Sequence, residues 1–113
     1  MVKRIYKYPL GTINGGQIGV EVPLHSRLLT VDADPRGDIC AWYIVDTKIT
    51  ETTHHLFALV GTGQALIPRD FLERYEFFNT IKDGAFVWHV FIQPGIQNSR
   101  PDISAAMKKT WNP

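Results

Sequence analysis

Short apolar runs separated by turn residues set the pattern of this chain. Clusters of Gly, Pro, Asn and Asp interrupt it at short intervals, as in Asn14-Gly15-Gly16 and Gly61-Thr62-Gly63. The runs between these clusters are rich in β-branched and aromatic residues, which pack well on a pleated surface. Regular short runs of this kind are typical of an all-β core. They predict about seven strands, at residues 4–8, 17–22, 27–33, 39–46, 54–60, 75–81 and 85–93.

Two of the connections predict tight hairpins. The pair Asp83-Gly84 suits the two positive-φ positions of a type I′ turn, so the runs on either side of it should be antiparallel neighbours. Residues 34–38, with the sequence DPRGD, are expected to form a type I turn that Gly37 closes in a left-handed conformation. Both turns therefore predict strands that pair with their neighbour in the sequence.

The central runs are apolar on both faces. In residues 39–46, alternate positions carry Ile, Ala, Tyr and Val on one side and Cys, Trp and Ile on the other. Residues 56–60 and 85–92 show the same feature, whereas an antiparallel sheet with one face in water alternates between apolar and polar positions. We therefore expect a single-domain antiparallel sandwich or partial barrel whose central strands are covered on both sides.

Two short helices are candidates for that cover. Residues 67–73 carry a proline near their start and suit about one helical turn. Residues 99–111 open with an S-x-x-D motif and place Met107 and Trp111 at helical spacing. Since neither helix can cover three strands, we predict a homo-oligomer that shares the remaining apolar face or the C-terminal helix between subunits. The expected layout is a β core over residues 1–93 and a C-terminal extension over 94–113.

Composition narrows the classes of partner. The chain has 113 residues, 44% of them hydrophobic, and a formal net charge of +1, so no long nucleic acid is expected. Cys40 is the only cysteine and lies in an apolar run, where a thiol behaves as a small hydrophobe. The start of the chain lacks the apolar region of a signal peptide, and no run reaches the length of a membrane span. We therefore expect a cytoplasmic protein with no membrane partner.

The residue types that carry chemistry form no recognisable catalytic set. His54 and His55 are neighbours in a predicted strand, so their side chains should point to opposite faces and cannot share a metal ion unless a bulge intervenes. If His55 and His89 face each other across paired strands, a pH-sensitive contact results. No nucleophile elbow and no paired carboxylates are present. We expect a protein that is not an enzyme and needs neither a cofactor nor a metal.

A small anionic ligand remains compatible with the sequence. Gly61-Thr62-Gly63 is too short for a phosphate-binding Walker loop and is first of all a bend at the end of a strand. Its backbone amides can still donate to an anion, and arginine and aromatic side chains can complete such a site. We predict that arginines hold the phosphate of a nucleotide and aromatic residues its base. The candidate ligand-binding residues are Arg27, Thr62, Gly63, Trp88, Arg100 and Trp111.

Four segments, taken in order and spacing, carry a resemblance to a known family. They are KYPL at residues 7–10, AWYIVD at 41–46, VGTG at 60–63 and GAFVWHVF at 84–91. Together they resemble a family of small uncharacterised proteins of tailed bacteriophages and bacteria, a domain of unknown function, over residues 3–92. The resemblance implies a phage accessory protein that acts inside the host bacterium.

That context favours one function over three others. We expect a sponge that sequesters a small nucleotide signal of host defence, such as a cyclic nucleotide, an analogy of context and architecture. The alternatives are an inhibitor that binds a host defence protein, an enzyme that uses His55 or His89, and a minor virion component.

Overall fold

The computed structural model describes residues 2–10 and 17–96 of the chain. The described residues form seven strands and one short helix, which confirms the predicted mainly-β class. In chain order these elements are β1 Lys3–Pro9, β2 Gln17–Pro23, β3 Arg27–Ala33, β4 Ile39–Asp46, β5 Thr52–Gly61, α1 Phe71–Arg74, β6 Glu76–Asp83 and β7 Phe86–Ile92.

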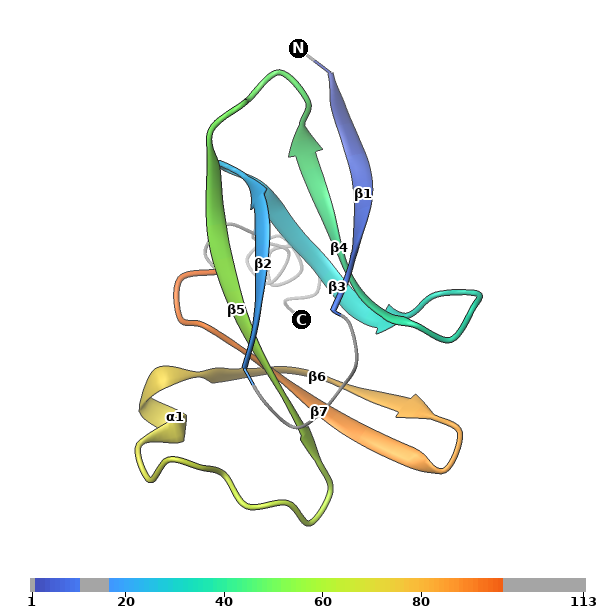
Figure 1. Ribbon diagram of the computed structural model, residues 1–113, viewed down its shortest axis with the longest axis vertical. Helices are drawn as coiled ribbons and strands as arrows, with labels where there is room; N and C mark the ends of the chain where they lie inside the picture. Colours follow the sequence, from blue (N-terminus) through green and yellow to red (C-terminus); the bar gives the residue numbers. More distant parts are fainter. Residues whose placement is uncertain (1, 11–16, 97–113) are drawn as a thin grey trace, which may run out of the picture.

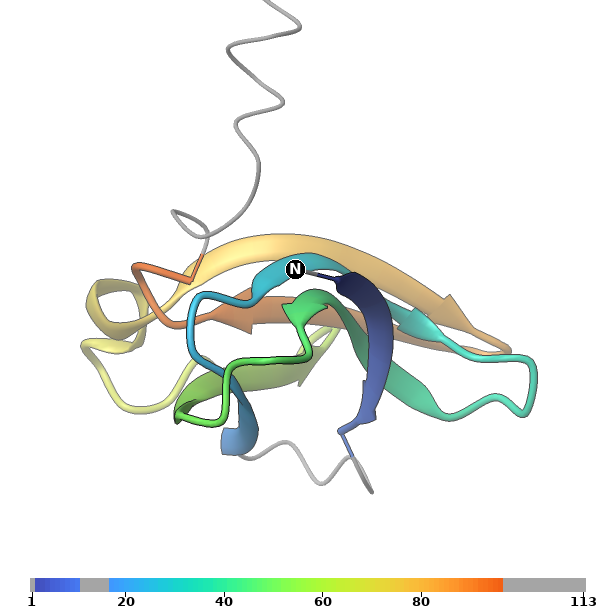
Figure 2. The same ribbon diagram turned by 90° about the horizontal axis from the view of Figure 1, so that it is seen from above.

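The strands form two antiparallel sheets (Figure 1). The three-stranded sheet has the order β1-β4-β3 and the four-stranded sheet the order β2-β5-β7-β6. At one side the two sheets are joined, because the amide of Asn79 in β6 donates to the carbonyl of Val31 in β3 at 2.8 Å. The β3–β4 and β6–β7 turns lie at the same end of the molecule, and α1 lies at the other end (Figures 1 and 2).

The core fills the space between the sheets. Its fully buried side chains include Tyr43 of β4, Phe57 and Leu59 of β5, and Val90 and Ile92 of β7. They come from alternate positions of their strands, because successive side chains of a strand point to opposite faces.

The outward faces of the central strands are apolar as well, as predicted. On β4, Cys40 is buried and Trp42 is half-buried. On the four-stranded sheet, Ala58 and Phe91 form a second apolar cluster with Phe71 and Tyr75. The predicted single helical turn thus exists, at Phe71–Arg74, and it covers part of the outer face of this sheet.

The two hairpin predictions have different outcomes. Gly37 has a φ of +87° and donates its N–H to the carbonyl of Asp34 at 2.8 Å, which confirms the left-handed closing position. The pairing of β6 with β7 is confirmed, but the type I′ turn at Asp83-Gly84 is wrong. Asp83 pairs with Phe86, and Gly84 is the first loop residue, with a φ of +60°. A positive φ at the first central position alone is typical of a type II′ turn, which favours glycine there.

Two further predictions lie beyond what the described residues test. The helix expected at 99–111 falls outside them, and the homo-oligomer stays a prediction. No helix within residues 2–10 and 17–96 is long and apolar enough to cross a membrane.

Candidate functional site

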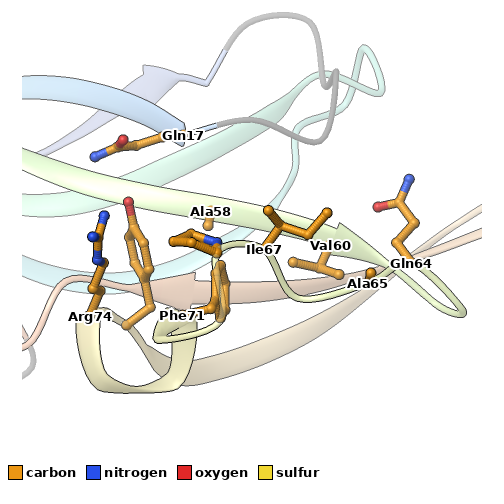
Figure 3. A pocket seen from close by; sticks show the side chains of 10 residues that line it. Gln17, Ala58, Val60, Gln64, Ala65, Ile67, Phe71 and Arg74 are labelled. Atoms are coloured by element: carbon orange, nitrogen blue, oxygen red, sulfur yellow. The ribbon is translucent and has the colours of Figure 1, made fainter.

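A hollow of about 430 Å³ opens on the outer face of the four-stranded sheet, between β5 and the segment that leads into α1 (Figure 3). Its volume lies in the usual range for small-molecule sites. We call it the α1 hollow. Its lining residues are Gln17, Ala58, Val60, Gln64, Ala65, Ile67, Pro68, Phe71, Arg74 and Tyr75.

The floor and one wall of the α1 hollow are apolar. Ala58 and Val60 project from the outer face of β5, where every second side chain points outward. Phe71 is 5% exposed, because its ring packs edge-on against Phe91 and stacks on Tyr75, each at 5.0 Å between ring centroids. These contacts fix the aromatic wall against the sheet.

Polar side chains stand at its rim. Gln17 and Arg74 lie towards one end and Gln64 towards the other (Figure 3). The Nε of Arg74 donates to Asp70 at 2.9 Å, which engages one of the five guanidinium N–H groups. The Oε1 of Gln64 accepts the N–H of Gly61 at 2.7 Å, so its amide nitrogen is left as a donor. The rim therefore offers hydrogen-bond donors around an apolar floor.

Tyr75 adds a hydroxyl to the same hollow. Burial raises the pKa of Tyr75 above its ordinary value, although the Arg74 charge and a hydrogen bond with Gln17 act in the opposite direction. The hydroxyl is therefore un-ionised at neutral pH and can both donate and accept.

His89 forms a second polar cluster on the same sheet face. Thr62 Oγ1 lies 2.8 Å from its Nε2, and Thr80 Oγ1 lies 3.1 Å from its Nδ1. A hydroxyl beside an oriented imidazole is the geometry of an activated nucleophile. However, His89 lines neither the α1 hollow nor the hollow of about 290 Å³ beside Trp88. We read the cluster as a link between the end of β5 and strands β6 and β7.

The predicted ligand-binding residues separate into three groups. Thr62 and Trp88 line one hollow of about 290 Å³, beside Phe86, whose ring stacks on Trp88 at 6.2 Å between centroids. Gly63 is the next residue of the same turn and has a φ of +90°, which confirms the bend at the end of β5. Arg27 lines a different hollow on the three-stranded sheet. Arg100 and Trp111 lie outside the described residues.

The histidine pair of β5 behaves as predicted, but the contact with His89 does not exist. His54 lies 3.3 Å from Glu21 on the exposed face, whereas His55 points into the interior and its Nδ1 lies 2.8 Å from the Tyr43 hydroxyl. His89 pairs with Val60 and occupies the outer face. The proposed contact between His55 and His89 is therefore wrong, because the sheet separates the two rings.

Neither Cys40 nor a cluster of metal-binding side chains provides a reactive centre in the described part of the chain. Cys40 is buried, and burial raises the pKa of its thiol, as expected for an unreactive cysteine. Within the described ranges, no group of three or more His, Cys, Asp or Glu side chains could hold a metal ion.

Sequence reasoning missed the α1 hollow. Its polar side chains come from three separate segments of the chain and match no motif; they are Gln17, Gln64, Arg74 and Tyr75. The available signal was the proline-started turn at 67–73, which predicted an element packed on the sheet but not the space beside it.

Comparison with known proteins places the chain in a family. Its residues 1–100 match the model of DUF7352, a domain of unknown function, so the match extends further than the 3–92 stretch of the predicted resemblance. No curated protein and no solved structure matches the chain. The chain belongs to the DUF7352 family.

Proposed function

We propose that this protein binds a small anionic ligand of the nucleotide class in the α1 hollow and holds it without changing it. One observation carries the proposal: donors from Gln17, Gln64 and Arg74 surround an apolar floor and a fixed aromatic wall in a space of about 430 Å³. A few polar groups placed around an apolar hollow are what orients a small molecule.

The chemistry of the rim suits the parts of a nucleotide. A flat base buries its faces against apolar and aromatic surface, here Val60 and Phe71. The amides of Gln17 and Gln64 match the donor and acceptor groups at a base edge. Arg74 is the cation of the lining, and its remaining N–H groups can pair with a phosphate.

The lining also favours binding over turnover. Its side chains are apolar or belong to Gln, Arg and Tyr, and no nucleophile among them is paired with a base. We extend the proposal to the context that the sequence suggested, a phage protein that sequesters a host nucleotide signal.

Calorimetry against a panel of linear and cyclic nucleotides tests the proposal. We expect one member to bind at micromolar concentration and to be recovered unchanged by mass spectrometry. Arg74→Gln should weaken it about tenfold or more, since a hydrogen bond to a charged group contributes about 1.5–3 kcal/mol. Arg69→Gln is the matched control, because Arg69 is an exposed cation of the segment that leads into α1 and lies outside the lining.

Two results would contradict it. If no panel member binds, the nucleotide class is wrong. If Arg69→Gln weakens binding as much as Arg74→Gln, general surface charge and not the hollow accounts for the affinity.

A second proposal concerns self-association. Ile67, Leu72 and Phe77 are 76%, 65% and 53% exposed, and all three lie on or beside the α1 side of the four-stranded sheet. Apolar side chains gathered in this way favour a protein contact, and a second copy of the chain is the partner we propose. Analytical ultracentrifugation should show a dimer or larger species that Leu72→Glu converts to a monomer. A monomeric wild-type protein would rule out this contact.

A further inference from the structure

A small hollow with two cationic side chains lies at the end of the three-stranded sheet where β1 and β3 begin. Lys3 is the first residue of β1 and Arg27 the first of β3, and both strands run antiparallel to β4, which ends at Asp46. Antiparallel pairing brings the starts of β1 and β3 to the end of β4. The result is a hollow of about 220 Å³, which we call the Lys3 corner. It is lined by Lys3, His25, Arg27, Ile44, Val45, Asp46 and Ile49.

The cations of the Lys3 corner lack partners in the described part of the chain. The ion pairs between described residues are Lys7 with Asp34, Arg74 with Asp70 and His54 with Glu21. Neither Lys3 nor Arg27 forms one, and Asp46, the cross-strand partner of Lys3, is the carboxylate that lines the same hollow. Two cations against one carboxylate leave the hollow with a net positive charge, which raises the local concentration of anions.

His25 is held at this hollow by an unusual backbone conformation. Its φ is +66°, which makes it the one residue other than glycine with a positive φ among the described residues. The turn is closed by the N–H of Ser26, which donates to the carbonyl of Pro23 at 3.1 Å. This third position of a turn favours glycine when φ is positive. A side chain that lines a hollow from a strained backbone position is a reason to look for function there.

Asp46 adds a negatively charged carboxylate to the Lys3 corner. Its Oδ1 accepts the N–H of Lys48 at 3.0 Å, which fixes the carboxylate beside the cations. Asp46 repels a bare anion but accepts hydrogen bonds from hydroxyl groups. Ile44 and Ile49 supply apolar surface in the same hollow.

We infer that the Lys3 corner binds a sugar phosphate. The phosphate lies against Lys3, His25 and Arg27, the sugar hydroxyls donate to Asp46, and the carbon face of the ring packs on Ile44 and Ile49. The volume of about 220 Å³ is half that of the α1 hollow, so the ligand that we propose here is smaller than a nucleotide. The inference is independent of the proposed nucleotide function, because the two hollows lie on different sheets.

Ribose 5-phosphate is the probe, and inorganic phosphate and ribose are the comparison ligands, each followed by NMR chemical-shift titration of the full chain. We expect ribose 5-phosphate to bind more tightly than either. Arg27→Gln should weaken it about tenfold or more. Lys82→Gln, which removes an exposed cation from β6 on the other sheet, should leave it unchanged. The inference is overturned by absence of binding at millimolar concentration, by equal loss in both variants, or by phosphate binding as tightly as the sugar phosphate.

Two further variants test the individual roles. His25→Gly should weaken the sugar phosphate while raising the melting temperature, because glycine relieves the positive φ. A purely structural histidine would give the higher melting temperature with unchanged affinity, which would overturn its role in binding. Asp46→Asn should tighten inorganic phosphate and reduce the preference for the sugar phosphate. An unchanged preference would overturn the contact with the hydroxyls.

Discussion

Tyr43→Phe should destabilise the fold through one hydrogen bond in its core. Tyr43 is 0% exposed, and its ring packs edge-on against Tyr8 at 5.5 Å between centroids. Its hydroxyl lies 2.8 Å from the Nδ1 of His55. Burial raises the pKa of Tyr43 well above its ordinary value, so the hydroxyl stays un-ionised and we assign it as the donor to a neutral imidazole. The contact joins β4 of one sheet to β5 of the other.

The expected loss follows from what the substitution leaves behind. Phenylalanine keeps the ring and its packing but removes the partner of His55 Nδ1 inside the protein. A buried acceptor without a partner costs about 1–3 kcal/mol, and because His55 is half-buried we expect a loss of about 1 kcal/mol. Each kcal/mol lowers the melting temperature of a domain of roughly this size by about 4–8 °C. We therefore expect the melting temperature to fall by at least about 4 °C.

Urea denaturation followed by tryptophan fluorescence and circular dichroism measures this loss. The midpoint should fall while the slope stays constant, since the exposed surface on unfolding is the same. Tyr6→Phe is the matched control, because Tyr6 is 45% exposed and lies on the edge strand β1. If the Tyr43 variant is as stable as the wild type, the hydrogen bond does not contribute and the reasoning is refuted.

Four further changes test other parts of the fold. Burial lowers the pKa of His55 below its ordinary 6.5, so the folded state disfavours the charged ring. The free energy of unfolding should therefore be highest above pH 6.5 and decrease as the pH falls below it. In urea titrations at several pH values, His55→Gln should reduce this dependence of stability on pH. The hydrogen bond with Lys7 holds the pKa of Asp34 below its ordinary 3.8, so the ionised carboxylate stabilises the fold above pH 3.8 and this stabilisation is lost as the pH falls below 3.8. Asp34→Asn should therefore reduce the dependence of stability on pH below 3.8, as measured by acid unfolding. Gly37→Ala should lower the free energy of unfolding by about 1–2 kcal/mol in denaturant titrations. An added methyl group meets no atom within 4 Å, so this loss comes from the positive φ and not from a clash. Asparagine tolerates a positive φ better than alanine, so an equal loss for Gly37→Asn would contradict this explanation. Phe71→Ala should lower the free energy of unfolding by about 3–5 kcal/mol, measured in denaturant titrations. It should also remove nucleotide binding, measured by calorimetry.

Local pattern was enough for the strands. Every predicted strand exists, and the 27–33 and 39–46 runs match β3 and β4 at both ends. Gly37 was predictable because its conformation depends on the turn around it. The predicted β6–β7 turn was misplaced by one residue. A loop of Asp83-Gly84 and a loop of Gly84-Ala85 both place glycine where φ can be positive, so the local sequence does not distinguish them. The pairing of Asp83 with Phe86 selects Gly84-Ala85.

What the sequence determined by itself was the class of the fold, the opposed directions of His54 and His55 and the need to cover both faces of the central strands. These follow from period-two alternation and turn residues, which act over a few positions. Only the tertiary structure decided the sheet order, the α1 hollow and the placement of Lys3 and Arg27 at one hollow. Each of those depends on which strands pair and in what register, and that is set by burial of the whole core between the sheets and not by any local segment.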